Sequence, residues 1–255
     1  MSTKKNEIAV QDTNTSLTTF EFTPEADAYG TEGLNGSDIR IPRVLLAQKM
    51  SPITDKPGSG LTPGDLWDSI TEEKIGDKGQ LFSFIPIHIF KTLTLQKMIN
   101  GKYEFQSSHA WVPAFANAPY EYETAEGKFK NMTNINVLAI KETDLGNPAA
   151  LPVTISFRST SLNCGKDIIA DCLQAKAKGA SSAQLTISIV SEIQTNDKGS
   201  YYVFKKKAPR LTKDYVDNKE IFKNWFELFS SGKAKIDEDK EETSQSNSGD
   251  TFTRF

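Results

Sequence analysis

The sequence predicts a mainly β domain with one or two helices, carried between two disordered acidic ends. Three observations favour this fold class. Short apolar runs are separated by Gly and Pro, which is typical of strands and turns. Only two segments place apolar residues at helical spacing. Both ends are poor in apolar side chains, so ordering them would cost entropy with little burial in return.

The charge is unevenly distributed along the chain. Residues 1–38 carry two lysines against seven acids, a net charge of −5, and residues 236–255 carry a net charge of −4. Because the whole chain has a net charge of −3, residues 39–235 carry +6. We therefore expect a flexible acidic arm over residues 1–38, a modestly basic domain over residues 39–232 and a disordered acidic tail over residues 233–255.

Seven segments of the body have the composition of strands. They cover residues 39–48, 65–68, 81–93, 134–140, 152–158, 184–193 and 201–205. Pro86 interrupts the third segment, which favours an edge strand or a β-bulge there. The last two segments are joined by a short loop that contains Gly199, so they are expected to form a hairpin.

Two helices are expected. The first runs over about residues 165–177, with Asn163 as its cap and Cys172 on its apolar face; the second runs over about residues 216–229. Short strands with one or two helices in a chain of this size favour a barrel or a sandwich. The five-stranded oligonucleotide-binding (OB) barrel is the leading candidate.

The sequence contains no motif of a catalytic or metal-binding protein. His88 and His109 lack partners at metal-ligand spacing, and Cys164 and Cys172 are too few and too close on a helix to form a disulfide framework. No glycine-rich nucleotide loop is present. We therefore expect no catalytic residue, no metal and no cofactor, in a protein that is not an enzyme.

The location of the protein is also predicted from what the chain lacks. The N-terminus has no apolar run, no apolar segment is long enough to cross a membrane, and the cysteine content suits a reducing compartment. We expect a cytoplasmic protein, in the host cytoplasm if a phage encodes it.

Basic residues interleaved with aromatic residues are the remaining candidate for function. Bases of single-stranded nucleic acid stack on aromatic rings, and lysine or arginine meets the phosphates. A strand over residues 201–206 would place an aromatic residue followed by a cation on each face. For any one residue, an ordinary core or surface position is the simpler interpretation. The clustered candidates are Phe90, Lys91, Lys97, Lys102, Tyr103, Phe105, Arg158, Lys166, Tyr201, Tyr202, Phe204, Lys205, Lys206, Lys207 and Arg210.

These features together resemble a known family. The order of Ile41-Pro-Arg-Val-Leu-Leu46, the Pro63-Gly-Asp65 turn, the apolar strand ending in Phe90-Lys91, the basic strand over residues 201–207 and the acidic tail ending in Phe255 is similar to that of bacteriophage single-stranded DNA-binding proteins of the OB-fold type. The resemblance implies an OB barrel that coats single-stranded DNA during replication and recombination. It also implies an acidic tail that recruits replication or recombination proteins or shields the DNA groove.

The tail has a feature of its own that fits partner binding. Phe252 and Phe255 place two aromatic anchors on an acidic tether, which suits a hydrophobic pocket lined by basic residues on another protein. Two other functions stay open: an interaction or inhibitor module acting on a nucleic-acid enzyme, and a structural component that assembles without nucleic acid. A homo-oligomer is possible in each case, and the sequence does not decide between DNA and RNA.

Overall fold

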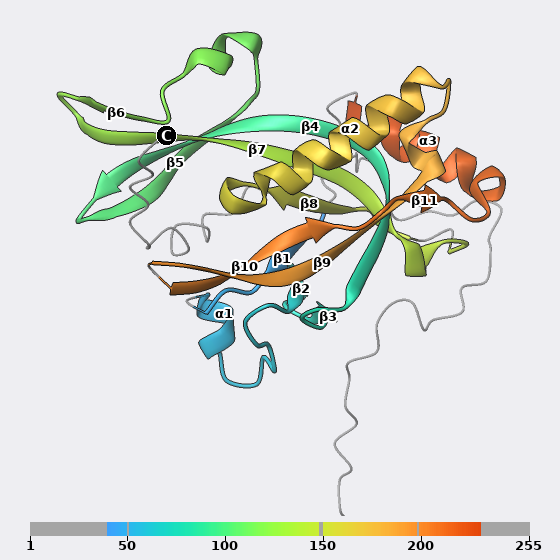
Figure 1. Cartoon of the computed structure of the whole chain (residues 1–255), viewed down its shortest axis with the longest axis horizontal. Coiled ribbons are helices and arrows are strands. Elements are labelled where there is room, and N and C mark those ends of the chain that lie inside the picture. Colours follow the sequence, from blue (N-terminus) through green and yellow to red (C-terminus); the bar gives the residue numbers. More distant parts are fainter. Residues whose placement is uncertain (1–39, 50, 148–149, 198, 231–255) are drawn as a thin grey trace, which may run out of the picture. The chain divides into compact units, whose positions relative to one another are not determined.

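One long strand, β4 (Leu81–Ile99), organises the sheet that dominates the structure (Figure 1). Its first residues pair with β9 (Leu185–Asn196) and its last residues pair with β5 (Lys102–Ala110). Strand β7 (Gly127–Lys141) pairs with β4 from Phe84 to Lys97. Strand β4 therefore belongs to two parts of the sheet at once.

The structure is a computed structural model that describes residues 40–49, 51–147, 150–197 and 199–230, all within one unit over residues 35–255. It is mainly β, as predicted. The other strands are β1 (Arg43–Leu46), β2 (Leu66–Asp68), β3 (Lys74–Gly76), β6 (Glu121–Thr124), β8 (Val153–Phe157), β10 (Gly199–Lys206) and β11 (Arg210–Leu211). The α-helices are α1 (Pro52–Asp55), α2 (Leu162–Ala177) and α3 (Tyr215–Ser230).

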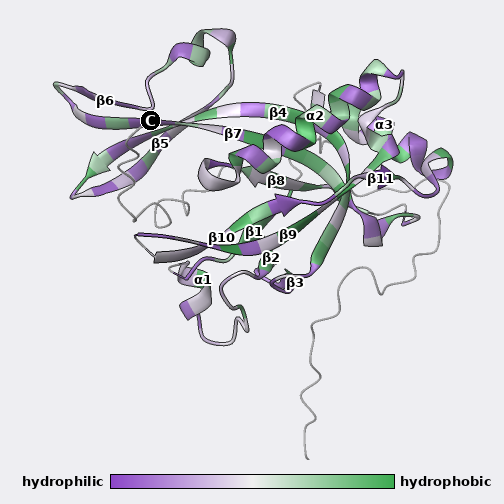
Figure 2. Ribbon diagram, viewed as in Figure 1, coloured by the Kyte–Doolittle hydropathy of each residue, from purple (hydrophilic) through white to green (hydrophobic). Residues whose placement is uncertain are grey.

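In the described residues all eleven strands join one sheet. Its order is β10-β9-β4-β7-β8-β1-β2-β3, and β11, β5 and β6 attach to β9, β4 and β7. Only β1 and β8 are parallel. We call "the wing" the four-stranded part made of β5, residues 91–99 of β4, residues 127–135 of β7, and β6. Figure 2 shows that β5 and β6 carry many hydrophilic residues, whereas hydrophobic residues dominate β4 where it meets β9.

The main core lies on the inner face of β4, β7, β8 and β9. It includes Phe84, Val137, Ile155 and Ile187, all fully buried. Helix α2 closes this core with Ile168, and its Gly165 allows close packing, since a Cβ there would lie 2.8 Å from Cβ of Phe157. This part of the inner face is therefore filled with packed side chains.

Helix α3 packs on the outer face of the same strands. A β-bulge between Pro86 and His88 adds one residue to β4, and Ile85 and Ile87 form a second core with Phe222 of α3. Leu138 and other residues of β7 complete it. At this end of β4 the outer face is thus covered by apolar packing.

Side chains hold β10 against the far end of the sheet, where strand pairing does not reach it. The Gln48 carboxamide, just after β1, donates to the carbonyl of Tyr202 at 2.9 Å and accepts from its N–H at 3.0 Å. The N–H of Phe204 donates to Oγ of Ser161 at 3.1 Å. These hydrogen bonds replace part of a missing strand ladder, because they satisfy backbone groups at the edge of β10.

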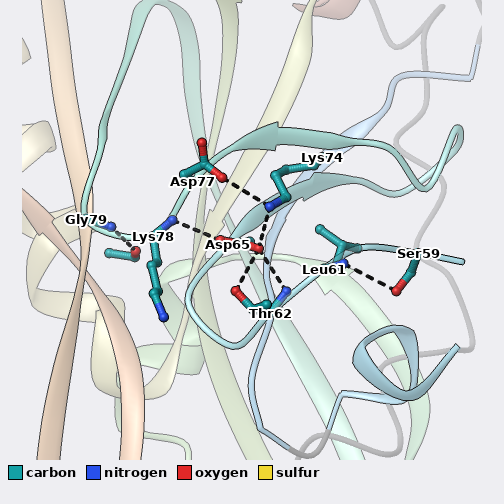
Figure 3. A network of polar contacts seen from close by, with 9 residues as sticks. Ser59, Leu61, Thr62, Asp65, Lys74, Asp77, Lys78 and Gly79 are labelled. Atoms are coloured by element: carbon teal, nitrogen blue, oxygen red, sulfur yellow. Dashed lines mark hydrogen bonds and ion pairs between the residues drawn. The ribbon is translucent and has the colours of Figure 1, made fainter. Parts of the chain in front are cut away.

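A buried carboxylate fixes the loop beside this contact (Figure 3). Asp65, 1% exposed, accepts hydrogen bonds from N–H and Oγ1 of Thr62 and from N–H of Lys78, and its Oδ2 lies 3.0 Å from Nζ of Lys74. Burial alone would raise the pKa of Asp65, but these donors outweigh it and lower the pKa below its ordinary value.

The sequence located most of these elements. Both long helices are confirmed, although α2 begins at Leu162 with Ser161 as its cap, so the prediction of Asn163 as the cap was wrong. The β9–β10 hairpin is confirmed, and Pro86 adjoins a bulge in a central strand, so the edge-strand alternative was wrong. Strands β5 and β6 were not predicted. The expected arm and tail lie outside the described residues.

We expect Gln48→Ala to lower the free energy of unfolding by about 1–2 kcal/mol, because two backbone groups of Tyr202 lose their partner. Urea unfolding followed by circular dichroism measures this. The matched control is Gln174→Ala on the exposed surface of α2. Equal stability of the two variants would contradict the bridging role of Gln48.

We expect Asp65→Asn to lower the free energy of unfolding at pH 7 by about 2–3 kcal/mol. The control is Asp77→Asn at the exposed partner of Lys74, which should lower the free energy of unfolding much less. The folded-state pKa of Asp65 is lowered, so its contribution is fully present above the ordinary value of 3.8 and is lost as the pH falls through the folded value. When unfolding is measured from pH 7 downward, the free energies of unfolding of the two variants should converge in acid. A constant difference would contradict this account.

Candidate nucleic-acid interface

A row of polar side chains crosses the outer face of the sheet next to α3. In antiparallel pairs, residues directly opposite each other point to the same face. Thr92 of β4 pairs with Asn134 of β7, and Asn136 of β7 pairs with Ser156 of β8. The outer row consists of Arg43, Thr92, Thr94, Gln96, Asn134, Asn136, Thr154 and Ser156.

Hydrogen bonds fix the orientation of the two asparagines. Nδ2 of Asn134 donates to Oγ1 of Thr92 at 3.3 Å and to Oγ1 of Thr94 at 2.7 Å. Nδ2 of Asn136 donates to Thr92 at 3.1 Å, while its Oδ1 accepts from Ser156 at 2.7 Å. Arg43 in turn donates to Ser156 at 3.4 Å. The row is therefore a connected network, and its hydrogen bonds determine which way each asparagine side-chain amide is oriented.

Three acceptors in the outer row remain unused. Among the described residues, the buried Oε1 of Gln96, Oδ1 of Asn134 and Oγ1 of Thr154 accept no hydrogen bond. A buried acceptor without a donor is costly. These three atoms are buried, so they are unpaired groups within the structure and do not themselves form a surface for a ligand.

The row continues onto the wing as a cation between two rings. Lys130, which pairs with Gln96, lies 5.3 Å from the ring centre of Tyr103 and 4.8 Å from that of Tyr120. Tyr120 is 43% exposed. Burial, with the nearby Glu121 carboxylate, raises the pKa of Tyr103, so its hydroxyl stays protonated at neutral pH. The exposed ring of Tyr120 and the buried ammonium group of Lys130 thus occur together at the end of the row.

Phe90 lies at the other end of the row, under α3. Its ring centre is 5.2 Å from that of Phe229 and 5.7 Å from that of His88, and His88 also contacts Phe226. Burial lowers the pKa of His88, so this aromatic cluster holds a neutral imidazole at pH 7. Phe90 is therefore occupied with packing and offers little ring surface to a base.

Lys91, Lys97 and Lys102 face the opposite side of the wing. Lys97 pairs with Phe129 and lies 5.6 Å from its ring centre, and Lys91 lies 5.0 Å from the ring centre of Trp111. Phe105 and Tyr103 belong to the outer face instead. The structure therefore divides the candidates of this region between the two faces.

The basic strand β10 lies at the far end of β4. Three candidate cations in or after this strand form ion pairs: Lys206 with Asp171, Lys207 with Glu192 at 2.9 Å, and Arg210 of β11 with Glu142. Phe204 is 4% exposed and packs edge-on against Phe157 in the core. Local acids therefore neutralise much of the charge that the sequence placed here.

The other candidates near β10 are scattered. Tyr201 is half-buried with its hydroxyl 3.4 Å from Gln194, and Tyr202 is half-buried next to Gly64. Lys205 and Lys166 are exposed and Arg158 is half-buried. The two phenylalanines of the tail, Phe252 and Phe255, lie outside the described residues. Strand β10 pairs with β9 and is not one of the wing strands.

Cys164 and Cys172 are free and buried, and burial raises their pKa to about 12 and about 11, so neither is a reactive thiolate at neutral pH. In the described ranges no cluster of three or more His, Cys, Asp or Glu residues could hold a metal ion. None of the helices there is long and apolar enough to cross a membrane.

Sequence reasoning missed Lys130, Tyr120, Asn134 and Asn136. One signal was available, because Lys128-Phe129-Lys130 repeats the interleaving of cations and aromatics that drew attention to β10. The asparagines gave no signal, since only strand register shows that they face the same way as Thr92.

No curated protein and no solved structure is significantly similar to the chain. A family model described as "Pam3 phage gp34-like protein" matches residues 11–235, which is most of the sequence and includes every described residue. The chain therefore belongs to the Pam3 phage gp34-like protein family.

Proposed function

We propose that this phage-family protein binds single-stranded DNA without catalysis, on the outer face of β4, β7 and β8 and on the adjoining face of the wing. The observation that carries the proposal is the outer row, which ends at Lys130 between Tyr103 and Tyr120. It places the exposed ring of Tyr120 beside Lys130, whose side chain is buried between the two rings. Bases can stack on exposed ring surface in a sequence-tolerant way.

The strand order supports an OB barrel as the fold behind this activity. Taken in chain order, β4, β7, β8, β9 and β10 would be its five strands: a long curved first strand pairs with the second and the fourth, and α2 lies between the third and the fourth. The closing contact of the fifth strand would be made by the Gln48 and Ser161 side chains. OB folds bind oligonucleotides on the face of strands two and three, which here carries the outer row.

The position of α3 fits a role of the C-terminal tail at the same site. Phe229, near the end of α3, packs on Phe90, and Phe90 pairs with Asn136 of the outer row. Helix α3 therefore ends beside the proposed interface. We propose that the acidic tail recruits replication or recombination proteins through Phe252 and Phe255, as the resemblance to phage single-stranded DNA-binding proteins implies.

We expect Tyr120→Ala to weaken binding of a mixed-sequence oligonucleotide by about 1–3 kcal/mol, roughly five- to a hundredfold, because one stacking ring is removed. Fluorescence anisotropy with the full-length protein measures this. The control Tyr120→Phe keeps the ring and should bind like the unchanged protein.

Salt dependence supplies a second criterion. Binding should weaken as the salt concentration rises. A plot of the logarithm of the affinity against the logarithm of the salt concentration should have a slope of about −0.7 per phosphate contacted. Absence of salt-dependent binding in the unchanged protein would contradict the proposal and favour the alternative of a protein-interaction module.

A further inference from the structure

The two faces of the wing carry different chemistry. On the outer face, strand register places Lys128 and Lys130 with Glu121 and Glu123, so the charges balance. On the opposite face, register places Lys91, Lys97 and Lys102, and Glu104 is the one acid that the wing strands contribute to it. The second face therefore has an excess of positive charge, which attracts phosphates.

This second face, which we call the lysine face, also carries aromatic rings. Phe129 stacks with Tyr122 at 5.4 Å, with the two ring planes 15° apart, and Lys97 lies over the Phe129 ring. Trp111 lies under Lys91. Trp111 and Tyr122 are half-buried and Lys91 and Lys102 are exposed, so the rings and the ammonium groups are both accessible.

The same strands build both faces, so the two cannot merge into one groove. Gln96 and Lys130 form one directly opposite pair, and Lys97 and Phe129 form the next. Successive residues of a strand point to opposite sides of the sheet. A ligand on the outer face therefore cannot touch the lysine face unless it passes around the wing.

We infer that the lysine face is a second site for single-stranded nucleic acid, so that one strand passes around the wing and contacts both faces. The inference rests on the proposed function, because the occupant of the lysine face is a further segment of the strand that the outer face binds. The lysines contact phosphates and the rings of Trp111 and Tyr122 stack on bases. Two linked contacts bind a long strand more tightly than either contact alone.

The test is the stoichiometry of a short oligonucleotide on the full-length protein. By isothermal titration calorimetry, an oligonucleotide of about 6 nucleotides, within the range of ~4–16 that one OB fold covers, should bind at two molecules per chain. Lys97→Ala with Lys102→Ala should reduce this to one. The control Lys176→Ala with Lys178→Ala removes the same charge at the end of α2 and should keep two.

Affinity for a long strand gives an independent readout. The Lys97→Ala, Lys102→Ala variant should lose on the order of a hundredfold in affinity for a strand that spans both faces, because the gain from linked contacts disappears. Its affinity for the short oligonucleotide at the outer face should not change. Circular dichroism checks that the variant is folded.

Each outcome separates the two proposals. One molecule per chain in the unchanged protein, lost with Tyr120→Ala, would overturn the second site and leave the proposed function standing. One molecule per chain, lost with Lys97→Ala and Lys102→Ala but kept with Tyr120→Ala, would overturn the outer face as the primary site. Two molecules in both the unchanged protein and the lysine variant would also overturn the inference.

Discussion

The alternation of side chains along β4 is the constraint on which the rest of the structure depends. Over nineteen residues this strand contributes first to the core sheet and then to the wing. Its inner residues fill the core with α2, while its outer residues meet α3 and then the polar row. The bulge at Pro86 sets this register, because one residue more or fewer would exchange the two faces.

Polarity changes along the outer face, although both ends of it are buried. Where α3 lies, Ile85, Ile87 and Leu138 are apolar and covered. Beyond Phe90 the same face carries Thr92, Asn134 and Asn136, a connected network that an ordinary core would not contain. A polar network of this kind gives fixed hydrogen-bonding directions, and the wing adds rings and cations beside it.

The fold could be predicted from local patterns more fully than the site could. Apolar spacing located α2 and α3, and alternation located the β9–β10 hairpin, because each depends on residues close in sequence. Strands β5 and β6 are polar and exposed, so they lack the apolar signal. The ion pair of Lys206 with Asp171 joins residues 35 positions apart, so sequence counted a free cation where the structure has a paired one. Likewise, only long-range register brings Asn134, Thr92 and Gln96 to one face.

The central claim is that single-stranded DNA lies on the outer face of β4, β7 and β8 and on the wing. Ultraviolet crosslinking of the full-length protein to a mixed-sequence single strand, followed by peptide mapping, tests it most directly. Crosslinks are expected at Tyr103 and Tyr120. Crosslinks confined to Tyr201 and Tyr202 of β10 would contradict it and return the site to the strand that the sequence first indicated.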